Sequence, residues 1–204
     1  FAATRAAGGL CISDEVQIGM GRMGTTFWGF ELHDVVPDIV SIGKPLGNGH
    51  PVAAVACTEA VAEYFANGME FFNTFGGNPV SSVIANTVID VVVEERLQEN
   101  AFEVGSYLKE ELLQLSKEFP IMGSIRGQGL FLGIEFVDLN INPLPIQATY
   151  FVNRMKDHGV LMSTDGPDNN VIKIKPPMVF SIDNAKELIF LLNKILQEDL
   201  MQFY

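Results

Sequence analysis

The sequence has little positive charge and no long apolar run. Its 204 residues include 13 Lys and Arg against 25 Asp and Glu, for a formal net charge of −12. Nucleic acid is therefore not expected as a partner, because phosphate backbones are bound by clustered Lys and Arg. No stretch approaches the roughly 18 consecutive apolar residues of a membrane span, so no membrane partner is expected either.

Cysteine is also scarce, which excludes a disulfide framework. Cys11 and Cys57 are the only two, so a reducing compartment is the default. Both lie in apolar stretches, and we expect both in the core. The sequence opens on Phe1 with no targeting pattern, as a processed protein or a fragment would, so this end gives no evidence about location.

Apolar material, by contrast, is ample. Hydrophobic residues make up 48% of the chain and charged residues 19%, which excludes intrinsic disorder. The length suits one large domain or two small ones.

Strand and helix patterns alternate along the chain and predict an α/β fold with a largely parallel sheet. Strands are expected at 8–14, 38–43, 52–57, 130–137, 160–163 and 171–175, and helices at 58–66, from Pro79, at 99–117, at 146–158 and from an N-cap at Asp183. The glycine-rich stretch 15–37 is expected to be an ordered loop. Two domains, 1–97 and 98–204, are predicted.

Asp14 ends one predicted strand and Lys44 follows the next, and α/β sheets bind ligands at these strand ends. A lysine held between glycines can form a Schiff base with pyridoxal phosphate, although an ordinary surface lysine is the alternative. Asp14 could pair with the protonated pyridine nitrogen or simply cap a turn. Glu15 could serve either way, and Gln17 could bond the ring hydroxyl or satisfy the loop backbone.

A polar turn precedes the helix that starts at Pro79. Thr74, Gly76, Gly77 and Asn78 could bind a phosphate through a hydroxyl, backbone N–H groups and the helix N-terminus, or form a bare turn. The three histidines, His33, His50 and His158, show no metal spacing. The aromatic residues Phe27, Trp28 and Phe30 are expected to pack in the core rather than to stack on a ligand.

Taken together, these segments resemble the class III pyridoxal-phosphate aminotransferases. The matching stretches are SDEVQIGMGRMG at 13–24, FWGFELHDVVPDIVSIGKPLGNGHPVAAV at 27–55, FNTFGGNPV at 72–80, IRGQGLFLGIEF at 125–136 and IKPPMVFSIDNA at 174–185. The resemblance implies part of the type I fold of pyridoxal 5'-phosphate (PLP) enzymes: part of the large domain in 1–97 and the small C-terminal domain in 98–204.

The resemblance also implies residue roles. Lys44 would bind the cofactor and move the proton, Asp14 would partner the pyridine nitrogen and Gln17 would contact the ring oxygen. Thr74 would bind the cofactor phosphate, usually that of the neighbouring subunit, which implies a homodimer or a higher homo-oligomer. The family is often mitochondrial.

Within the family, the likeness is to the phospho-lyases of ethanolamine phosphate and 5-phosphohydroxylysine. It is carried by GKPLGNGHPVA at 43–53 and LMSTDGPDNNVIKIKPPMVFSIDNA at 161–185. Typical members place an arginine in the strand before the Pro-Pro pair, where it grips a substrate carboxylate. Here that position is Lys173, and Lys175 is expected on the same strand face. Both could attract a phosphate; the alternative for Lys175 is an ordinary solvated side chain.

Three hypotheses follow. The first is a phospho-lyase that releases phosphate and ammonia from a phosphorylated amine and leaves an aldehyde. The second is a class III aminotransferase that uses an amino acid and an oxo acid. The third is a non-enzymatic, truncated chain, because the resemblance leaves out an N-terminal segment, a phosphate loop and an aromatic residue that stacks on the ring.

Overall fold

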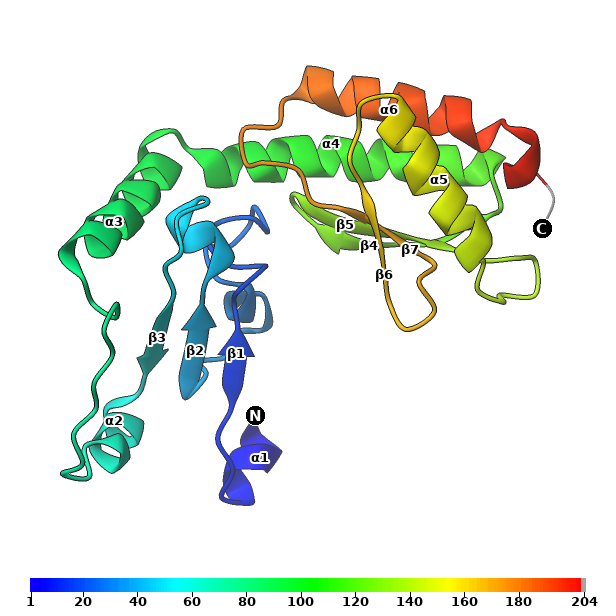
Figure 1. Ribbon diagram of the computed structural model, residues 1–204. Coiled ribbons are helices and arrows are strands. Elements are labelled where there is room, and N and C mark those ends of the chain that lie inside the picture. The colour runs from blue at the N-terminus through cyan, green and yellow to red at the C-terminus, as the bar shows by residue number, and fades with distance from the viewer. Residues whose placement is uncertain (203–204) are drawn as a thin grey trace. The chain divides into compact units, whose positions relative to one another are not determined.

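The computed structural model describes residues 1–202 and divides the chain into two units, Phe1–Gln98 and Glu99–Tyr204 (Figure 1). The assignment of these parts to a large and a small domain stays a prediction. Among the described residues, no helix is both long and apolar enough to cross a bilayer.

The first unit is built on a three-stranded sheet with the order β1-β2-β3. Its elements are α1 (Ala2–Ala6), β1 (Ile12–Asp14), η1 (Gly29–His33), β2 (Ile39–Ile42), η2 (Lys44–Gly47), β3 (Ala54–Cys57), α2 (Glu59–Phe65) and α3 (Pro79–Glu94). The strand, loop and helix predictions for this part are confirmed, although the strands are shorter than expected.

The expectation of a largely parallel sheet is wrong. Only β1 and β2 pair in parallel; β3 runs antiparallel to β2, and all pairs in the second unit are antiparallel, among the strands of residues 1–202. Parallel neighbours need a crossover of about a dozen residues or more, usually a helix. The connection from β2 to β3 contains η2 and no crossover helix, so the chain reverses and β3 pairs antiparallel with β2.

The start of α3 matches its sequence signals. Pro79 takes the first helical position, where its missing N–H costs nothing, and the Asn78 side chain accepts the Ser81 N–H at 2.9 Å. Val92 and Ala85 are buried on the inner face of this helix.

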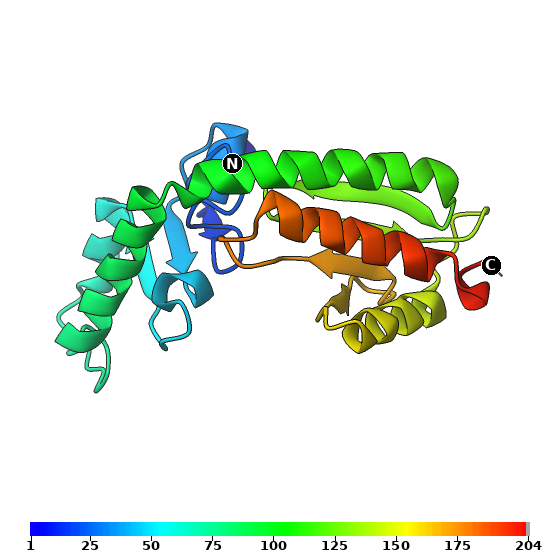
Figure 2. The ribbon, with the colours of Figure 1, turned by 90° about the horizontal axis from the view of Figure 1, so that it is seen from above.

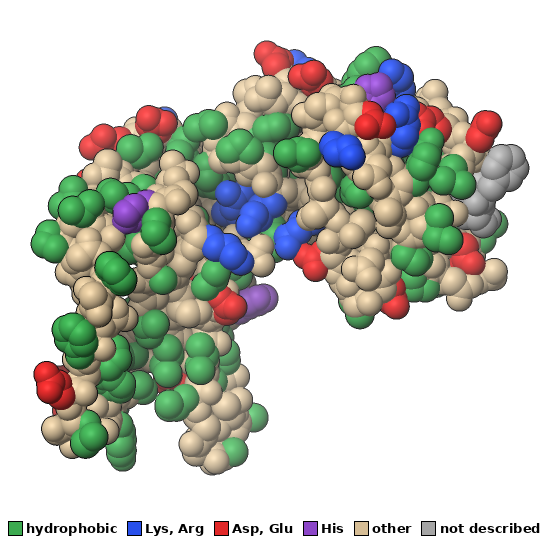
Figure 3. Space-filling model, viewed as in Figure 1, with side chains coloured by type: hydrophobic (Ala, Val, Ile, Leu, Met, Phe, Trp, Pro, Cys, Tyr) green, Lys and Arg blue, Asp and Glu red, His purple; other side chains and the backbone are tan. Residues whose placement is uncertain are grey.

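Apolar side chains remain exposed around α2 and the segment after it, as the green atoms of the first unit show in Figure 3. They include Tyr64, Phe65, Phe72 and Phe75. All four residues of β3 are exposed as well. The prediction that Cys57 lies in the core is therefore wrong, because β3 is an edge strand; Cys11 is buried as expected.

The second unit packs helices on one antiparallel sheet with the order β4-β5-β7-β6 (Figure 2). Its elements are β4 (Met122–Gln128), β5 (Phe131–Phe136), α5 (Pro145–Asp157), β6 (Ser163–Asp165), β7 (Val171–Ile174), α6 (Ile182–Leu196) and η3 (Asp199–Met201). The long helix α4 (Leu97–Glu118) belongs mostly to this unit.

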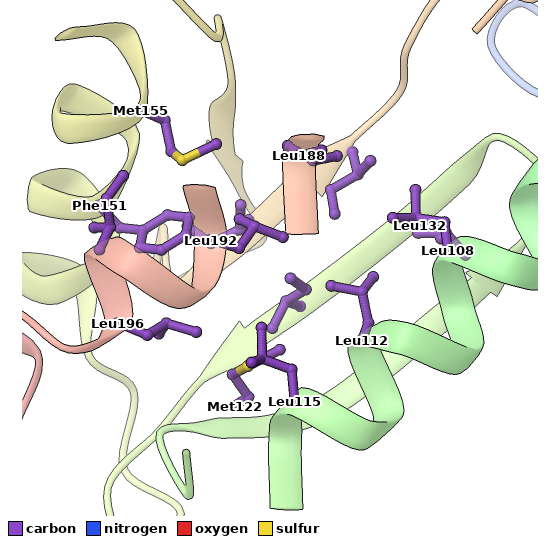
Figure 4. Packing of buried hydrophobic residues seen from close by; sticks show 14 of the residues in the cluster. Leu108, Leu112, Leu115, Met122, Leu132, Phe151, Met155, Leu188, Leu192 and Leu196 are labelled. Atoms are coloured by element: carbon purple, nitrogen blue, oxygen red, sulfur yellow. The ribbon is translucent and has the colours of Figure 1, made fainter. Parts of the chain in front are cut away.

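The core of this unit lies between the sheet and its helices. Leu112 of α4, Phe151 of α5 and Leu192 of α6 are fully buried and belong to one cluster (Figure 4). Phe136 of β5 meets Phe151 edge to face, with ring centroids 5.2 Å apart. Apolar burial of this kind is the main source of fold stability.

Three details of this unit differ from the sequence predictions. The strand β4 was not predicted, the strand expected at 160–163 begins at Ser163, and α6 is capped by Ser181 rather than Asp183. Ser181 and Asn184 form a reciprocal capping box, whereas Asp183 lies in the first turn and pairs with Lys186 at 3.0 Å.

Candidate functional site

Two strand ends of the first unit bring Asp14 and Lys44 to the same edge of its sheet. Asp14 is the last residue of β1 and pairs with Ser41 of the parallel strand β2. Lys44 follows β2 after a single residue, Gly43. Because parallel strands end at one edge, both residues lie at the same edge of this sheet.

Lys44 carries an unusual backbone. Its φ is +25°, on the left-handed side that non-glycine residues avoid, and its side chain is exposed. Such strain costs on the order of 1–3 kcal/mol and clusters at functional sites. The backbone of Lys44 is thus held at a strand end in a conformation that the surrounding turns impose.

Asp14 shows the turn-capping role that the sequence allowed. Its Oδ1 accepts the Val16 N–H at 3.0 Å and the Ser41 hydroxyl at 3.2 Å. The residue is exposed, so a carboxylate anchored through one oxygen lies at the surface of this strand end. Gln17 is half-buried in the loop just beyond.

The neighbouring acid, Glu15, has a structural role that the sequence left open. Its carboxylate is fully buried and accepts the N–H groups of Gly29 and Phe30 at 2.7 and 2.9 Å. It also accepts the Ser13 hydroxyl at 2.9 Å. Glu15 therefore fastens the 15–37 loop, and Asp14 alone of the two acids is open to a ligand.

The aromatic residues of this loop pack as expected. Phe27 and Trp28 meet edge to face at 5.0 Å and lie against a small cluster around Met20, Leu46 and Ala85. The cluster connects the loop to η2 and α3, so the turn that begins at Lys44 is supported by packed apolar side chains.

Thr74 lies in a turn, residues 73–78, that we call the phosphate turn. Thr74 is exposed, but the N–H groups of Phe75 and Gly76 are donated to Asn73 Oδ1 at 3.1 and 2.9 Å. The side-chain oxygen of Asn73 thus accepts two backbone N–H groups that could otherwise bind an anion, and these two hydrogen bonds fix the turn. The Thr74 hydroxyl remains the exposed polar side chain that the turn presents.

The two lysines singled out from the sequence belong to the second unit. Lys173 of β7 pairs with Asp165 of β6 at 2.6 Å, and this hydrogen bond lowers the pKa of Asp165. Lys175 lies one residue beyond the end of β7, so the strand alternation does not place it beside Lys173. Asp165 was not found from the sequence, because only the register of the β6–β7 hairpin brings it to Lys173.

Metal-binding geometry is not seen in residues 1–202: no group of three or more His, Cys, Asp or Glu side chains could hold an ion. His50, which the sequence left without a role, instead contacts Ser81.

A model of the family described as "Aminotransferase class-III" matches residues 2–196. The chain belongs to the class III aminotransferase family. The match covers both units and includes the strand ends that carry Asp14 and Lys44.

Individual class III relatives are similar over most of this chain. It is 52% identical over 193 residues to the alanine–glyoxylate aminotransferase 2-like protein of Drosophila melanogaster, covering 93% of this chain and 39% of that protein. It is 44% identical to the mitochondrial alanine–glyoxylate aminotransferase 2 of Homo sapiens, covering 92% and 38%. The chain therefore spans about two fifths of the length of these relatives.

Solved class III structures show the same fold. A phospholyase from Arthrobacter in complex with phosphoethanolamine matches with a TM-score of 0.92 and 42% identity, over 96% of this chain and 47% of that one. A Bacillus anthracis aminotransferase matches with a TM-score of 0.89 and 33% identity, over 96% and 46%. The prediction of a partial α/β fold of the PLP aminotransferase type is confirmed.

The cofactor of this family is PLP, as expected from the sequence. The residues present fit it chemically: an exposed amine and an exposed carboxylate at the strand ends, and an exposed hydroxyl on a fixed turn, suit an aldehyde, a pyridinium N–H and a phosphate.

Proposed function

We propose that the whole protein to which this chain belongs is a PLP-dependent phospho-lyase that eliminates phosphate from a phosphorylated amine, with ethanolamine phosphate the favoured substrate. The observation that carries this proposal is Lys173, which stands where an arginine would grip a carboxylate. Similarity to the Arthrobacter phospholyase, which was solved with phosphoethanolamine, supports it.

The chemistry of Lys173 favours a phosphate over a carboxylate. An arginine offers two parallel N–H donors to a carboxylate, whereas a lysine is a compact point charge without that fork. One N–H of Lys173 is already donated to Asp165, so two N–H groups remain for a substrate anion. A lysine can bind a phosphate as a point charge, without the planar fork that suits a carboxylate. We assign Lys173 and Lys175 to the phosphate of the phosphorylated amine.

The residues of the first unit divide the remaining work. Lys44 holds the cofactor and, once freed, takes a proton from the substrate carbon that bears the amine. Asp14 keeps the ring nitrogen protonated, Gln17 contacts the ring oxygen and Thr74 binds the cofactor phosphate. When bound, PLP supplies an electron sink for the carbon that loses its proton.

The net reaction balances without any further reactant except water. The carbon that bears the amine loses a proton, and the bond from the next carbon to the phosphate oxygen breaks, with its electron pair leaving on phosphate. The carbon that lost phosphate takes up a proton, and water then replaces nitrogen at the carbon that bore the amine. The products of ethanolamine phosphate are acetaldehyde, ammonia and phosphate.

The second candidate is an aminotransferase, and the names of the relatives favour it. The Drosophila, Arabidopsis and human proteins are called alanine–glyoxylate aminotransferase 2 or 2-like. Such an enzyme would share the proton transfer by Lys44 but pass the substrate nitrogen to an oxo acid. The plant and human relatives are named mitochondrial, and we extend that location, with a homodimer, to this protein as part of the proposal.

The test uses the whole protein loaded with PLP, phosphoethanolamine as substrate and no oxo acid. The phospho-lyase proposal predicts stoichiometric release of phosphate and acetaldehyde. If no phosphate is released and the protein instead converts alanine and glyoxylate, the phospho-lyase proposal is wrong and the aminotransferase is correct. Lys173→Arg is the matched variant: it should weaken phosphoethanolamine turnover and improve binding of amino acids that carry an α-carboxylate.

A further inference from the structure

His50 lies between η2 and β3 and reaches a helix that begins well beyond that strand. Its Nε2 is 2.8 Å from Ser81 Oγ in the first turn of α3. Both side chains are half-buried. Neither residue has a role in the proposed reaction so far, yet their contact joins the two segments that carry Lys44 and Thr74.

On one side, His50 is tied to Lys44 by three consecutive turns. The N–H groups of Leu46, Asn48 and His50 are donated to the carbonyls of Gly43, Pro45 and Gly47 at 2.9, 3.1 and 2.9 Å. A Cβ on Gly47 would lie 2.7 Å from Val52 Cγ1, so this loop, residues 43–52, is tightly folded on itself. The tight fold of this loop therefore fixes Lys44 itself and sets where the His50 ring stands relative to it. We call residues 43–52 the lysine loop.

On the other side, Ser81 is tied to the phosphate turn. Asn78 Oδ1 accepts the Ser81 N–H, while Asn78 Nδ2 donates to Ser81 Oγ at 2.9 Å and to the Phe75 carbonyl at 2.7 Å. Ser81 Oγ therefore accepts one hydrogen bond from Asn78 and shares a second with His50 Nε2, in which the donor is set by the imidazole tautomer.

Apolar packing supports the same junction. Leu46 of η2 and Ala85 of α3 belong to one buried cluster, so η2 and α3 are in contact below the polar bridge. The His50–Ser81 hydrogen bond therefore joins two segments that already pack together. Apolar packing holds them close, and the hydrogen bond sets how far one segment is shifted along the other.

We propose that His50 and Ser81 are positioning residues that hold the phosphate turn in register with the lysine loop, and so set the affinity for the phosphate of PLP. The proposal rests on the roles assigned above to Lys44 and Thr74. In a homodimer every site contains the same bridge, so its effect on affinity does not depend on which subunit's cofactor the turn meets.

The test compares PLP with pyridoxal, which lacks the phosphate, as ligands of the whole apoprotein. His50→Phe keeps a ring of similar size but removes the hydrogen bond, and Ser81→Ala removes it from the other side. Each should weaken PLP binding about three- to tenfold and leave pyridoxal binding unchanged. The double variant should be no weaker than either single one. His50→Gln, which keeps a hydrogen-bonding group near the Nε2 position, should restore PLP affinity.

Ser82→Ala is the matched control, because Ser82 lies beside Ser81 and bonds only the Asn78 carbonyl. It should leave both affinities unchanged. Equal weakening of PLP and pyridoxal by His50→Phe would overturn the proposal and indicate a general structural role. Unchanged PLP affinity in His50→Phe and Ser81→Ala, with loss in Thr74→Ala, would also overturn it. Retained affinity in both Lys44→Ala and Thr74→Ala would instead contradict the proposed function.

Discussion

At the residue scale, substitutions of Lys44 should change turnover and folding stability in different ways. Its positive φ penalises any side chain, so glycine is the residue best suited to that backbone. Lys44→Ala and Lys44→Gly should both lose turnover by about 100-fold or more, since both remove the proton-transfer group. The glycine variant should be more stable than the alanine variant by about 1 kcal/mol.

Urea unfolding of the two apoprotein variants measures this difference directly. The exposed Lys186 provides a control, because Lys186→Ala and Lys186→Gly sit in a helix, where the order of stability should reverse. Equal or lower stability of Lys44→Gly would mean that the turn imposes no strain at this position.

Glu15 and Glu31 form a second contrast at this scale. Both accept two backbone N–H groups, but Glu15 is fully buried and Glu31 is exposed. Glu15→Gln places an amide N–H₂ against buried donors and should cost about 1–3 kcal/mol of unfolding free energy. Glu31→Gln should cost less, because water replaces the lost bond. Equal losses in chemical denaturation would contradict this role of burial.

The site residues were predictable from the sequence only in part. Asp14 and Lys44 follow apolar strands, so their common edge could be expected. The division of labour between Asp14 and Glu15 could not, because it depends on which carboxylate meets the N–H groups of Gly29 and Phe30. The pairing of Lys173 with Asp165 depends in the same way on a hairpin register.

At the scale of elements, α4 rests closely on the β4–β5 hairpin. Gly105 faces the backbone of Gly129, which a Cβ at position 105 would overlap. Alanine is intrinsically the better helix former, but backbone cannot move aside as a flexible side chain does. Gly105→Ala should therefore destabilise the protein, by about 1–3 kcal/mol.

Ser106→Ala is the control for this prediction, because Ser106 is exposed on the same helix. It should be neutral or slightly stabilising in the same thermal or urea unfolding experiment. A Gly105→Ala variant as stable as the Ser106→Ala variant would show that the helix can shift away from the hairpin at no cost.

Elements with a strong local signal were predicted correctly. Pro79 correctly marks the start of α3, and the helix predicted at 99–117 lies within α4. The strand β4 was missed because its residues do not alternate cleanly between buried and exposed. The direction of the strands could not be read from alternation alone, since it depends on what connects β2 to β3.

At the scale of the whole molecule, hydrogen-bonded carboxylates with lowered pKa values add to the stability of this acidic chain at neutral pH. Hydrogen bonds from Arg154, with a contribution from Tyr150, lower the pKa of Glu198 to about 2. An acid with a lowered pKa in the folded state stabilises the fold above its unfolded pKa, and this stability is lost as the pH falls toward about 2. Asp38 and Asp165 shift in the same direction.

Glu198→Gln should therefore be less stable than the unchanged protein at neutral pH, and the difference should shrink as the pH falls below about 4.5. Urea unfolding across this pH range measures the difference. Glu187→Gln, an exposed acid on α6, is the control and should show no such trend. A Glu198→Gln deficit that stays constant down to the acid limit would contradict the assigned pKa shift.

The central claim is that this chain provides the lysine that binds PLP, and one measurement tests it directly. The whole protein, loaded with PLP, is reduced with borohydride and digested, and the modified peptide is identified by mass spectrometry. The account predicts a single stoichiometric cofactor adduct on Lys44, absent from Lys44→Ala. A stoichiometric adduct on another lysine, or retention of the adduct in Lys44→Ala, would contradict it.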